Sequence, residues 1–206
     1  MTQTSDFDVL LMTLNQYGVV DTEVIDAVLN ETSIQHFNAE EALIRIGEKP
    51  ELFYVIRRGL IRYYYAANNG KVWNKVFFRE GQFSGSLNAL ITDGPCRYNV
   101  EAIEDTEVYA LPLDLIHRNL GLHQQLQQLK IRLTEEMFLR NESREAFLLT
   151  CNAGARYQWL LENERWLVER VPQYHLASYL GMDAVSFSRI KNKAVDSSCR
   201  GSNRLS

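Results

Sequence analysis

The pattern of apolar and polar positions divides the chain into three stretches of different periodicity. Up to about Glu31 apolar residues recur at helical spacings interrupted near Gly18, which predicts one or two short helices. From about Ile34 to Leu113 the segments are short, rich in Tyr, Phe, Val and Ile, and punctuated by glycines, which is typical of antiparallel strands. Beyond Leu113 the spacing becomes helical again.

The middle stretch predicts a sandwich or small barrel of jelly-roll type. Asn69-Gly70 predicts a hairpin turn, because both residues tolerate a positive φ. The consecutive residues Tyr63, Tyr64 and Tyr65 are interpreted as alternating faces of one strand. The predicted strands are 53–57, 60–66, 72–79 and 100–111.

A long helix is predicted to follow the strands. Its apolar residues lie three or four positions apart and form a narrow seam between Gln, Lys, Arg and Glu side chains. We interpret this segment as a dimerisation helix; the alternative is that its seam packs against the chain's own β domain. The seam consists of Leu122, Leu126, Leu129, Leu133 and Met137.

Residues 171–193 predict two short helices joined by a tight turn. Pro172 suits a first helical turn, Gly181 stands where a helix would end, and Asp183 is a candidate N-cap of a second helix. This spacing is that of a helix-turn-helix, which would place the second helix, up to about Ala194, in a DNA major groove. An ordinary helical hairpin is the alternative.

Charge and composition narrow the class of protein. The chain has 206 residues and a net charge of −4, but residues 165–206 hold seven Lys or Arg against three acids. This asymmetry indicates an acidic body with a basic tip. No apolar run approaches the length of a membrane helix, and the N-terminus does not resemble a signal peptide, so we expect a soluble cytoplasmic protein. Three distant cysteines indicate neither a disulfide framework nor a metal site.

The sequence does not predict an enzyme. The four histidines are scattered without metal-ligand spacing, and the segment 81–85 has Phe where a nucleophile elbow needs Ser. The acids Glu101, Glu104 and Asp105 are interpreted as surface residues near a turn. We therefore expect no catalytic site, no bound metal and no cofactor.

This order of elements, with three of its segments, resembles the bacterial transcription regulators of the cyclic-AMP receptor protein and fumarate/nitrate-reduction regulator (Crp/Fnr) family. The resemblance covers roughly residues 30–194 and implies an α+β fold. Its domains would be a β-roll effector domain with N-terminal helices over 1–120, a dimerisation helix over 121–149 and a helix-turn-helix domain with a polar tail over 150–206. The segments that carry it are 47–59, 83–87 and 173–181.

The sequence departs from the family at the effector pocket. Cyclic-nucleotide-binding members have a Gly-Glu pair that lines the ribose and, ten residues after the Glu, an Arg that binds the cyclic phosphate. Here Ser86 follows Gly85, and the Arg position holds Cys96, with Arg97 one place further on. A one-residue shift in a strand turns a side chain to the opposite face unless a bulge restores it. We therefore do not expect cyclic-nucleotide binding in the usual mode, nor an iron-sulfur cluster, because the N-terminus lacks cysteine. The candidate pocket is Gly85, Ser86, Leu87, Cys96 and Arg97.

The resemblance places the base-reading positions at Ala184, Val185 and Arg189. Arg189 suits a bidentate contact to guanine, and the two apolar side chains suit a thymine methyl group. Tyr174 and His175 are candidates for backbone contact; a packed or a merely solvated role is the alternative for each. The expected phosphate contacts are Ser186, Ser188, Lys191 and Lys193.

The C-terminus is the second departure from the family. Residues 196–206 form a polar, Ser-rich tail that predicts no regular structure where the family has a β-hairpin wing. Either the wing has been lost, or the sequence is shortened or altered near Lys193.

Taken together, these patterns predict a dimeric regulator that binds a near-palindromic DNA operator, with RNA polymerase as a further candidate partner. The alternative is a ligand-binding signalling module whose helix-turn-helix mediates protein interaction.

Overall fold

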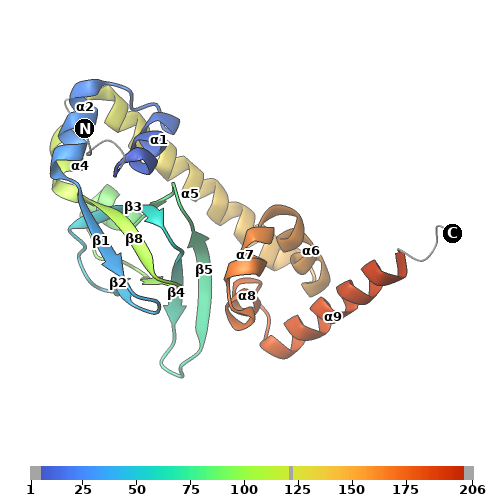
Figure 1. The fold of residues 1–206 in the computed structure, drawn as a ribbon. Coiled ribbons are helices and arrows are strands. Elements are labelled where there is room, and N and C mark those ends of the chain that lie inside the picture. The colour runs from blue at the N-terminus through green and yellow to red at the C-terminus, as the bar shows by residue number, and fades with distance from the viewer. Residues whose placement is uncertain (1–5, 121–122, 202–206) are drawn as a thin grey trace. The chain divides into compact units, whose positions relative to one another are not determined.

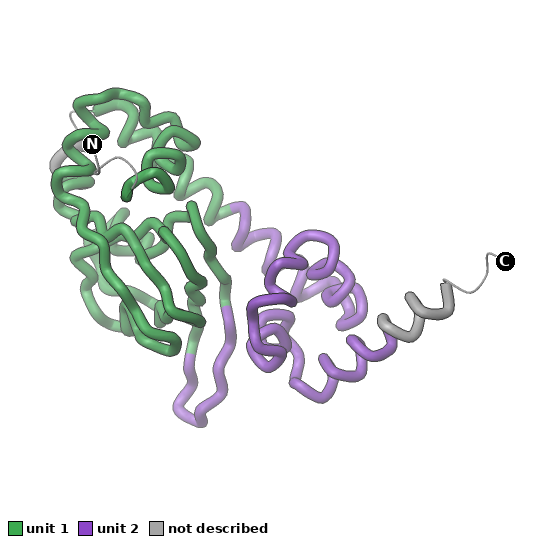
Figure 2. The backbone as a smooth tube through the Cα atoms, in the orientation of Figure 1, with its two compact units in different colours: residues 1–65, 75–138 green, residues 66–74, 139–206 purple. Residues whose placement is uncertain are grey.

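The computed structural model describes residues 6–120 and 123–201, without the side chains of residues 118–120 and 194–201. The chain divides into two compact units (Figure 2). Unit 1 comprises residues 1–65 and 75–138, and unit 2 comprises residues 66–74 and 139–206. Helices come first, then strands, then helices again, as the apolar pattern predicts (Figure 1).

Two four-stranded antiparallel sheets form a β-roll, which confirms the predicted α+β class. Their strand orders are β1-β8-β3-β6 and β2-β7-β4-β5. Gly70 adopts a φ of +79° in the predicted turn between β4 and β5. The strands are β1 (Ser33–Phe37), β2 (Ala42–Ile44), β3 (Leu52–Arg58), β4 (Ile61–Ala66), β5 (Val72–Phe78), β6 (Phe83–Ser84), β7 (Asn99–Ala102) and β8 (Thr106–Pro112).

Side chains alternate between two apolar layers along the central strands. In β3, Phe53 and Val55 join one cluster, whereas Tyr54 and Ile56 join the other. The second cluster takes residues from both sheets and therefore lies between them. This period of two is what a strand covered on both faces requires.

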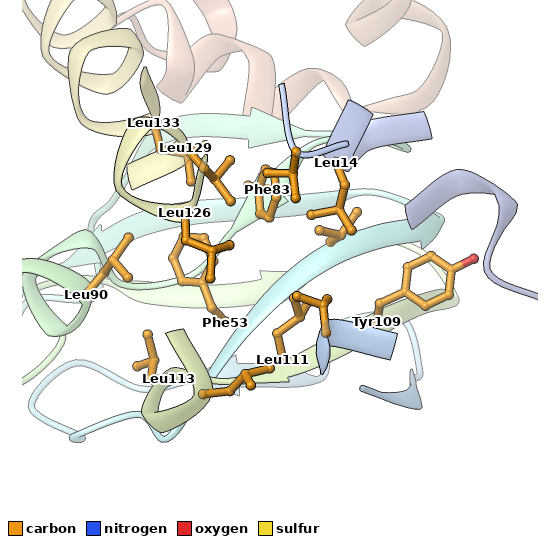
Figure 3. Close-up of a cluster of buried hydrophobic side chains, with 14 of the residues drawn as sticks. Leu14, Phe53, Phe83, Leu90, Tyr109, Leu111, Leu113, Leu126, Leu129 and Leu133 are labelled. Carbon is orange, nitrogen blue, oxygen red and sulfur yellow. The ribbon is translucent and has the colours of Figure 1, made fainter. Parts of the chain in front are cut away.

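The first cluster is covered by helices of unit 1. Figure 3 shows Leu126, Leu129 and Leu133 of α5 gathered with Phe53 and Phe83. Burial of these side chains removes a large apolar area from water, which stabilises the β-roll. The helices are α1 (Asp8–Gln16), α2 (Thr22–Glu31), α4 (Leu113–Leu120) and the part of α5 (Gln124–Thr150) that belongs to unit 1.

The position of the α5 leucines corrects the interpretation of the seam. Leu126, Leu129 and Leu133 are only 4%, 6% and 7% exposed within the single chain. Met137 packs against the cluster between the sheets, and Leu122 lies outside the described residues. The β-roll already covers these three leucines, so they pack against the chain's own β domain, which was the alternative interpretation. A dimer contact along α5 therefore needs another face of the helix.

Two local features differ from the sequence prediction. The expected strand 100–111 is two strands, β7 and β8, because the chain turns at residues 103–105, where the Thr106 hydroxyl donates to the Glu104 carbonyl at 2.7 Å. A short helix, α3 (Leu87–Thr92), was not predicted. Its N-cap is Ser86, whose Oγ accepts from the Ala89 N–H at 3.2 Å.

Unit 2 combines the second part of α5, the tip of the β4–β5 hairpin and four further helices. Tyr157, Leu160, Leu176, Leu180 and Phe187 are buried in it. The helices are α6 (Ala153–Asn163), α7 (Arg165–Arg170), α8 (Gln173–Tyr179) and α9 (Ala184–Gly201).

The backbone of α9 continues further than the sequence predicts. It is helical through Gly201, so residues 196–201 are helical where no regular structure was expected. In the part of the chain that the structure describes, no helix is long and apolar enough to cross a membrane.

Candidate nucleic-acid interface and effector pocket

Helices α8 and α9 are joined by a turn that matches the predicted helix-turn-helix. Gly181 has a φ of +66°, a conformation that side chains with a Cβ rarely adopt, and it ends the first helix. Asp183 caps the second helix: its carboxylate accepts from the Ser186 N–H and from the Ser186 hydroxyl, both at 2.8 Å. These hydrogen bonds lower the pKa of Asp183 below its ordinary value.

One face of α9 anchors the helix in unit 2. Phe187 is 1% exposed, and its ring meets that of Tyr157 edge to face at 5.5 Å between centroids. Because the anchor points inward, residues on the other side of the helix face outward.

The outward face of α9 carries most of the predicted DNA-contacting residues. Val185 is 61% exposed, and Ala184, Ser188, Arg189 and Lys193 are also exposed. Together they present methyl groups, a hydroxyl and two cations on one helix face, which is the chemistry that base edges and phosphates recognise.

Two of the predicted phosphate-contacting residues are less exposed than this group. Ser186 and Lys191 are half-buried, and the Ser186 hydroxyl is engaged in the cap by Asp183. Sequence reasoning also missed Asn192, which is exposed one helical turn beyond Arg189. Its spacing from Val185 and Arg189 could have indicated it, because Asn is suited to a bidentate contact with adenine.

The two candidates at the start of α8 behave differently. Tyr174 is 57% exposed, whereas His175 is buried. Within unit 2, the Asn74 amide of the hairpin tip donates to the His175 carbonyl at 2.9 Å and lies 3.2 Å from His175 Nδ1. His175 is therefore a packed residue of unit 2 and not a candidate for contact with a DNA backbone.

Arg156 of α6 donates hydrogen bonds to backbone carbonyls at the ends of two neighbouring helices. Its guanidinium donates to the carbonyls of Leu148 at 2.6 Å, Cys151 at 2.9 Å and Leu180 at 3.0 Å. These carbonyls end α5 and α8, where a helix leaves its last C=O groups without partners of its own. One cation thus fixes the ends of two helices.

In the β-roll, Gly85 lies between β6 and α3. Its φ is +152°, and an added Cβ would overlap the ring of Phe53. The neighbouring Ser86 is fully buried as the cap of α3, and Leu87 is half-buried. Packing against Phe53 and capping of α3 therefore account for Gly and Ser at these two positions without a ligand.

The two candidate phosphate-binding positions face opposite environments. Cys96 is 2% exposed, and its thiol lies 3.2 Å from the Tyr98 carbonyl, whereas Arg97 is exposed. Arg62 of β4 is engaged elsewhere, with its Nε and Nη2 at 2.9 and 2.6 Å from Glu101 Oε1. Hence the position where the resemblance implies an Arg for a cyclic phosphate holds a buried cysteine.

Two tyrosines fill the space beside Gly85. The rings of Tyr63 and Tyr98 stack with centroids 4.6 Å apart and planes inclined by 16°. Their hydroxyls donate to the Gly85 carbonyl at 2.9 and 3.0 Å, and Tyr63 Oη also lies 3.0 Å from Ser84 Oγ. Burial raises the pKa of Tyr98 far above its ordinary value, so its phenol is neutral. The residues here do not fit an anionic cyclic nucleotide.

A separate apolar pocket lies in unit 1, between α5 and the face of the β1-β8-β3-β6 sheet that the helices cover. Among the residues that the structure describes, every lining side chain is apolar except Lys130. None of the predicted effector residues lines it. In the described residues no group of three or more His, Cys, Asp or Glu side chains could hold a metal ion.

The fold and these sites define a protein with a cyclic nucleotide-binding-like β-roll and a C-terminal helix-turn-helix. Residues 34–120 match the family model of the cyclic nucleotide-binding domain. No curated protein sequence matches the chain.

Solved structures of transcription regulators share this fold. FixK2 from Bradyrhizobium japonicum matches with a TM-score of 0.73 and 21% identity, over 81% of this chain and 86% of that one. CLP from Xanthomonas campestris, a c-di-GMP responsive global regulator, matches with a TM-score of 0.70 and 14% identity, over 86% and 93%. A CRP-family regulator from Thermus thermophilus matches with a TM-score of 0.63 and 18% identity, over 80% and 85%. Residues 34–120 are therefore similar to the cyclic nucleotide-binding domain, and the chain has the fold of these transcription regulators.

Proposed function

We propose that the chain is a sequence-specific DNA-binding transcription regulator that places α9 in the major groove. The observation that carries this proposal is the two-sided character of α9. Phe187 anchors one side, while Val185 and Arg189 stand exposed on the other. A reading helix needs this combination, because base contacts discriminate only when the backbone that presents them is held rigidly.

The exposed residues divide into two roles. Arg189 reads guanine, Val185 and Ala184 contact a thymine methyl group, and Asn192 reads adenine. Ser188 and Lys193, with Tyr174 at the start of α8, contact phosphates and set the register of the helix on the duplex. Ser186 acts through the cap that it forms with Asp183.

The regulator acts as a homodimer whose α5 helices meet along their exposed face. Ile131 and Phe138 are 54% and 60% exposed and lie two helical turns apart on this helix. Apolar side chains at heptad spacing suit a helix–helix contact. Light scattering at micromolar concentration should show a dimer, and Phe138→Glu should shift it to a monomer, whereas Arg132→Glu on a different face should not. A wild-type monomer would contradict this part of the proposal.

The β-roll of this regulator does not take cyclic AMP in the usual mode. The support is the pair of neutral positions, Ser86 and Cys96, where the resemblance implies a carboxylate and a guanidinium. A phosphate in a semi-enclosed site needs such a cation to replace the water it loses.

The experiment is a selection of bound duplexes from a random pool with the full chain. At low salt we expect enrichment of a near-palindrome with half-sites about one DNA turn apart, because the two recognition helices of a dimer contact two successive half-sites. Affinity for the enriched duplex should fall steeply with salt, because phosphate contacts release counterions.

A second function remains open to the same test. A module whose helix-turn-helix binds a protein would enrich no duplex at low salt. That result would overturn the DNA-binding proposal.

A further inference from the structure

We propose that Tyr63 and Tyr98 act as an internal replacement for a ligand: they occupy the effector position of the β-roll and hold the Gly85 segment without any small molecule. The inference deepens the proposed function, on which its regulatory meaning rests. It implies a regulator whose β-roll is set in one state by its own side chains.

The first argument is the set of bonds around Gly85. Its N–H donates to Tyr63 Oη, and its carbonyl accepts from Tyr63 Oη at 2.9 Å and from Tyr98 Oη at 3.0 Å. Both polar groups of this peptide segment are thus satisfied by side chains of β4 and of the segment before β7. In family members that bind a cyclic nucleotide, the equivalent Gly lines the ribose of the ligand.

The second argument is the way in which the two rings are buried. Tyr63 is 2% exposed and Tyr98 is 7% exposed. Phe78 lies 4.7 Å from Tyr63 between centroids, and Tyr65 meets Tyr98 edge to face at 6.4 Å. Stacked and edge-to-face rings are mutually attractive beyond the area that they bury. The pair is therefore a packed part of the core, not a flap over an open site.

The third argument is the match between the pair and its neighbours. Two neutral phenols need neither a carboxylate nor a guanidinium beside them, and the chain has Ser86 and Cys96 at those two positions. A buried guanidinium without an anion would be strongly unfavourable. The uncharged residue types at positions 86 and 96 and the two tyrosines beside Gly85 are therefore consistent with one another.

The test begins with the wild-type full chain, titrated calorimetrically with cyclic AMP and with cyclic GMP. We expect no binding heat and no shift of the thermal midpoint at millimolar ligand. Micromolar binding of either nucleotide would overturn the proposal.

A positive test uses 4-methylphenol, the free equivalent of a tyrosine side chain. Tyr98→Ala leaves a cavity in which the Gly85 carbonyl has lost one of its two donors, and such cavities take up small aromatic molecules. We expect 4-methylphenol to raise the thermal midpoint of Tyr98→Ala and to leave that of wild type unchanged, because a ligand that binds only the folded state stabilises it. Tyr65→Ala, which removes a half-exposed ring at the rim, is the matched control and should show no such rescue.

Tyr98→Phe keeps the proposal testable if Tyr98→Ala does not fold. This variant retains the ring and removes only the hydroxyl that donates to the Gly85 carbonyl, so we expect a lower thermal midpoint. In Tyr63→Phe, which removes the acceptor of the Gly85 N–H, we expect faster amide exchange at Gly85. Wild-type values for both quantities would contradict the proposal, as would a folded Tyr98→Ala that 4-methylphenol does not stabilise. No DNA enters these measurements, so their failure would leave the DNA-binding proposal standing, and the reverse also holds.

Discussion

The Gly85 region of the β-roll and the outer face of α9 differ in the charge and the exposure of their side chains. Both are places where the family resemblance implies charged contact with a partner. Around Gly85 the charged types are replaced by Ser86 and Cys96, and two buried tyrosines close the space. On α9 the cation Arg189 is exposed. The difference teaches that one chain can bury uncharged side chains at one such place and expose a cation at the other.

The two regions should therefore respond differently to substitution. A change at the Gly85 region alters a close-packed interior and should appear in the free energy of unfolding. A change on the outer face of α9 should appear in DNA binding and leave stability nearly constant.

Restoring the family's cation at Cys96 should produce the largest loss of stability. Cys96→Arg forces a guanidinium into a site that is 2% exposed, so we expect the free energy of unfolding to fall by about 4–5 kcal/mol. Urea denaturation measures this loss. Arg97→Ala at the exposed neighbour is the control and should change stability by less than about 0.5 kcal/mol. A stable Cys96→Arg chain that binds cyclic AMP would break the comparison.

Truncation of the α9 anchor should be nearly as damaging. Phe187→Ala removes a ring that is 1% exposed and packed on Tyr157, which should lower the free energy of unfolding by about 3–4 kcal/mol. Val185→Ala on the outer face of the same helix should cost less than about 0.5 kcal/mol. Equal losses for the two variants would show that α9 is not two-sided.

The support of the helix ends by Arg156 should have a smaller effect. Arg156→Ala leaves the carbonyls of Leu148, Cys151 and Leu180 without their charged donor, and we expect a loss of about 2–3 kcal/mol in thermal or urea unfolding. Arg156→Lys keeps the charge but not the planar fork, so it should recover only part of this loss. Full recovery by Lys would mean that charge alone matters here.

Removal of the exposed cation should change specificity more than stability. With Arg189→Ala we expect a loss of about 1–3 kcal/mol at one base-pair position of the enriched operator, read from a panel of single-base variants. Lys193→Ala should weaken binding to all of these duplexes uniformly and reduce its salt dependence. A uniform loss with Arg189→Ala would assign that residue to phosphate contact.

The cap of α9 should give the smallest effect and a pH dependence of known sign. Because the pKa of Asp183 is lowered in the folded chain, its stabilising effect is present above the pKa of the unfolded chain and is lost as the pH falls through the folded value. A carboxyl titration by NMR should find this pKa below about 3.9, the usual value for Asp. Ser186→Ala should raise it. An unchanged pKa in that variant would show that the Ser186 hydroxyl contributes nothing to the cap.

Much of the fold followed from periodicity alone. The period of two in β3 and β8, the hairpin turn at Gly70 and the stop at Gly181 are local features, and each depends on a few adjacent residues. The short helix α3 was missed because its run of apolar residues is too brief to show a helical period.

The partners of a buried face could not be predicted in the same way. The seam on α5 was recognised as apolar, but spacing does not tell whether Leu126 or Leu129 meets the β-roll or a second chain. The pairing of Tyr63 with Tyr98 likewise depends on strands that are distant in sequence and meet only in the folded sandwich. By contrast, the outer face of α9 was largely predictable, because one helix determines which residues share a face.

The most direct measurement is the affinity of the full chain for its enriched operator and for a scrambled duplex, each with and without millimolar cyclic AMP. Our account predicts that the operator is preferred at least about a thousandfold at physiological salt and that cyclic AMP changes neither affinity. Equal affinity for the two duplexes, or an operator preference that appears only when cyclic AMP is present, would contradict it.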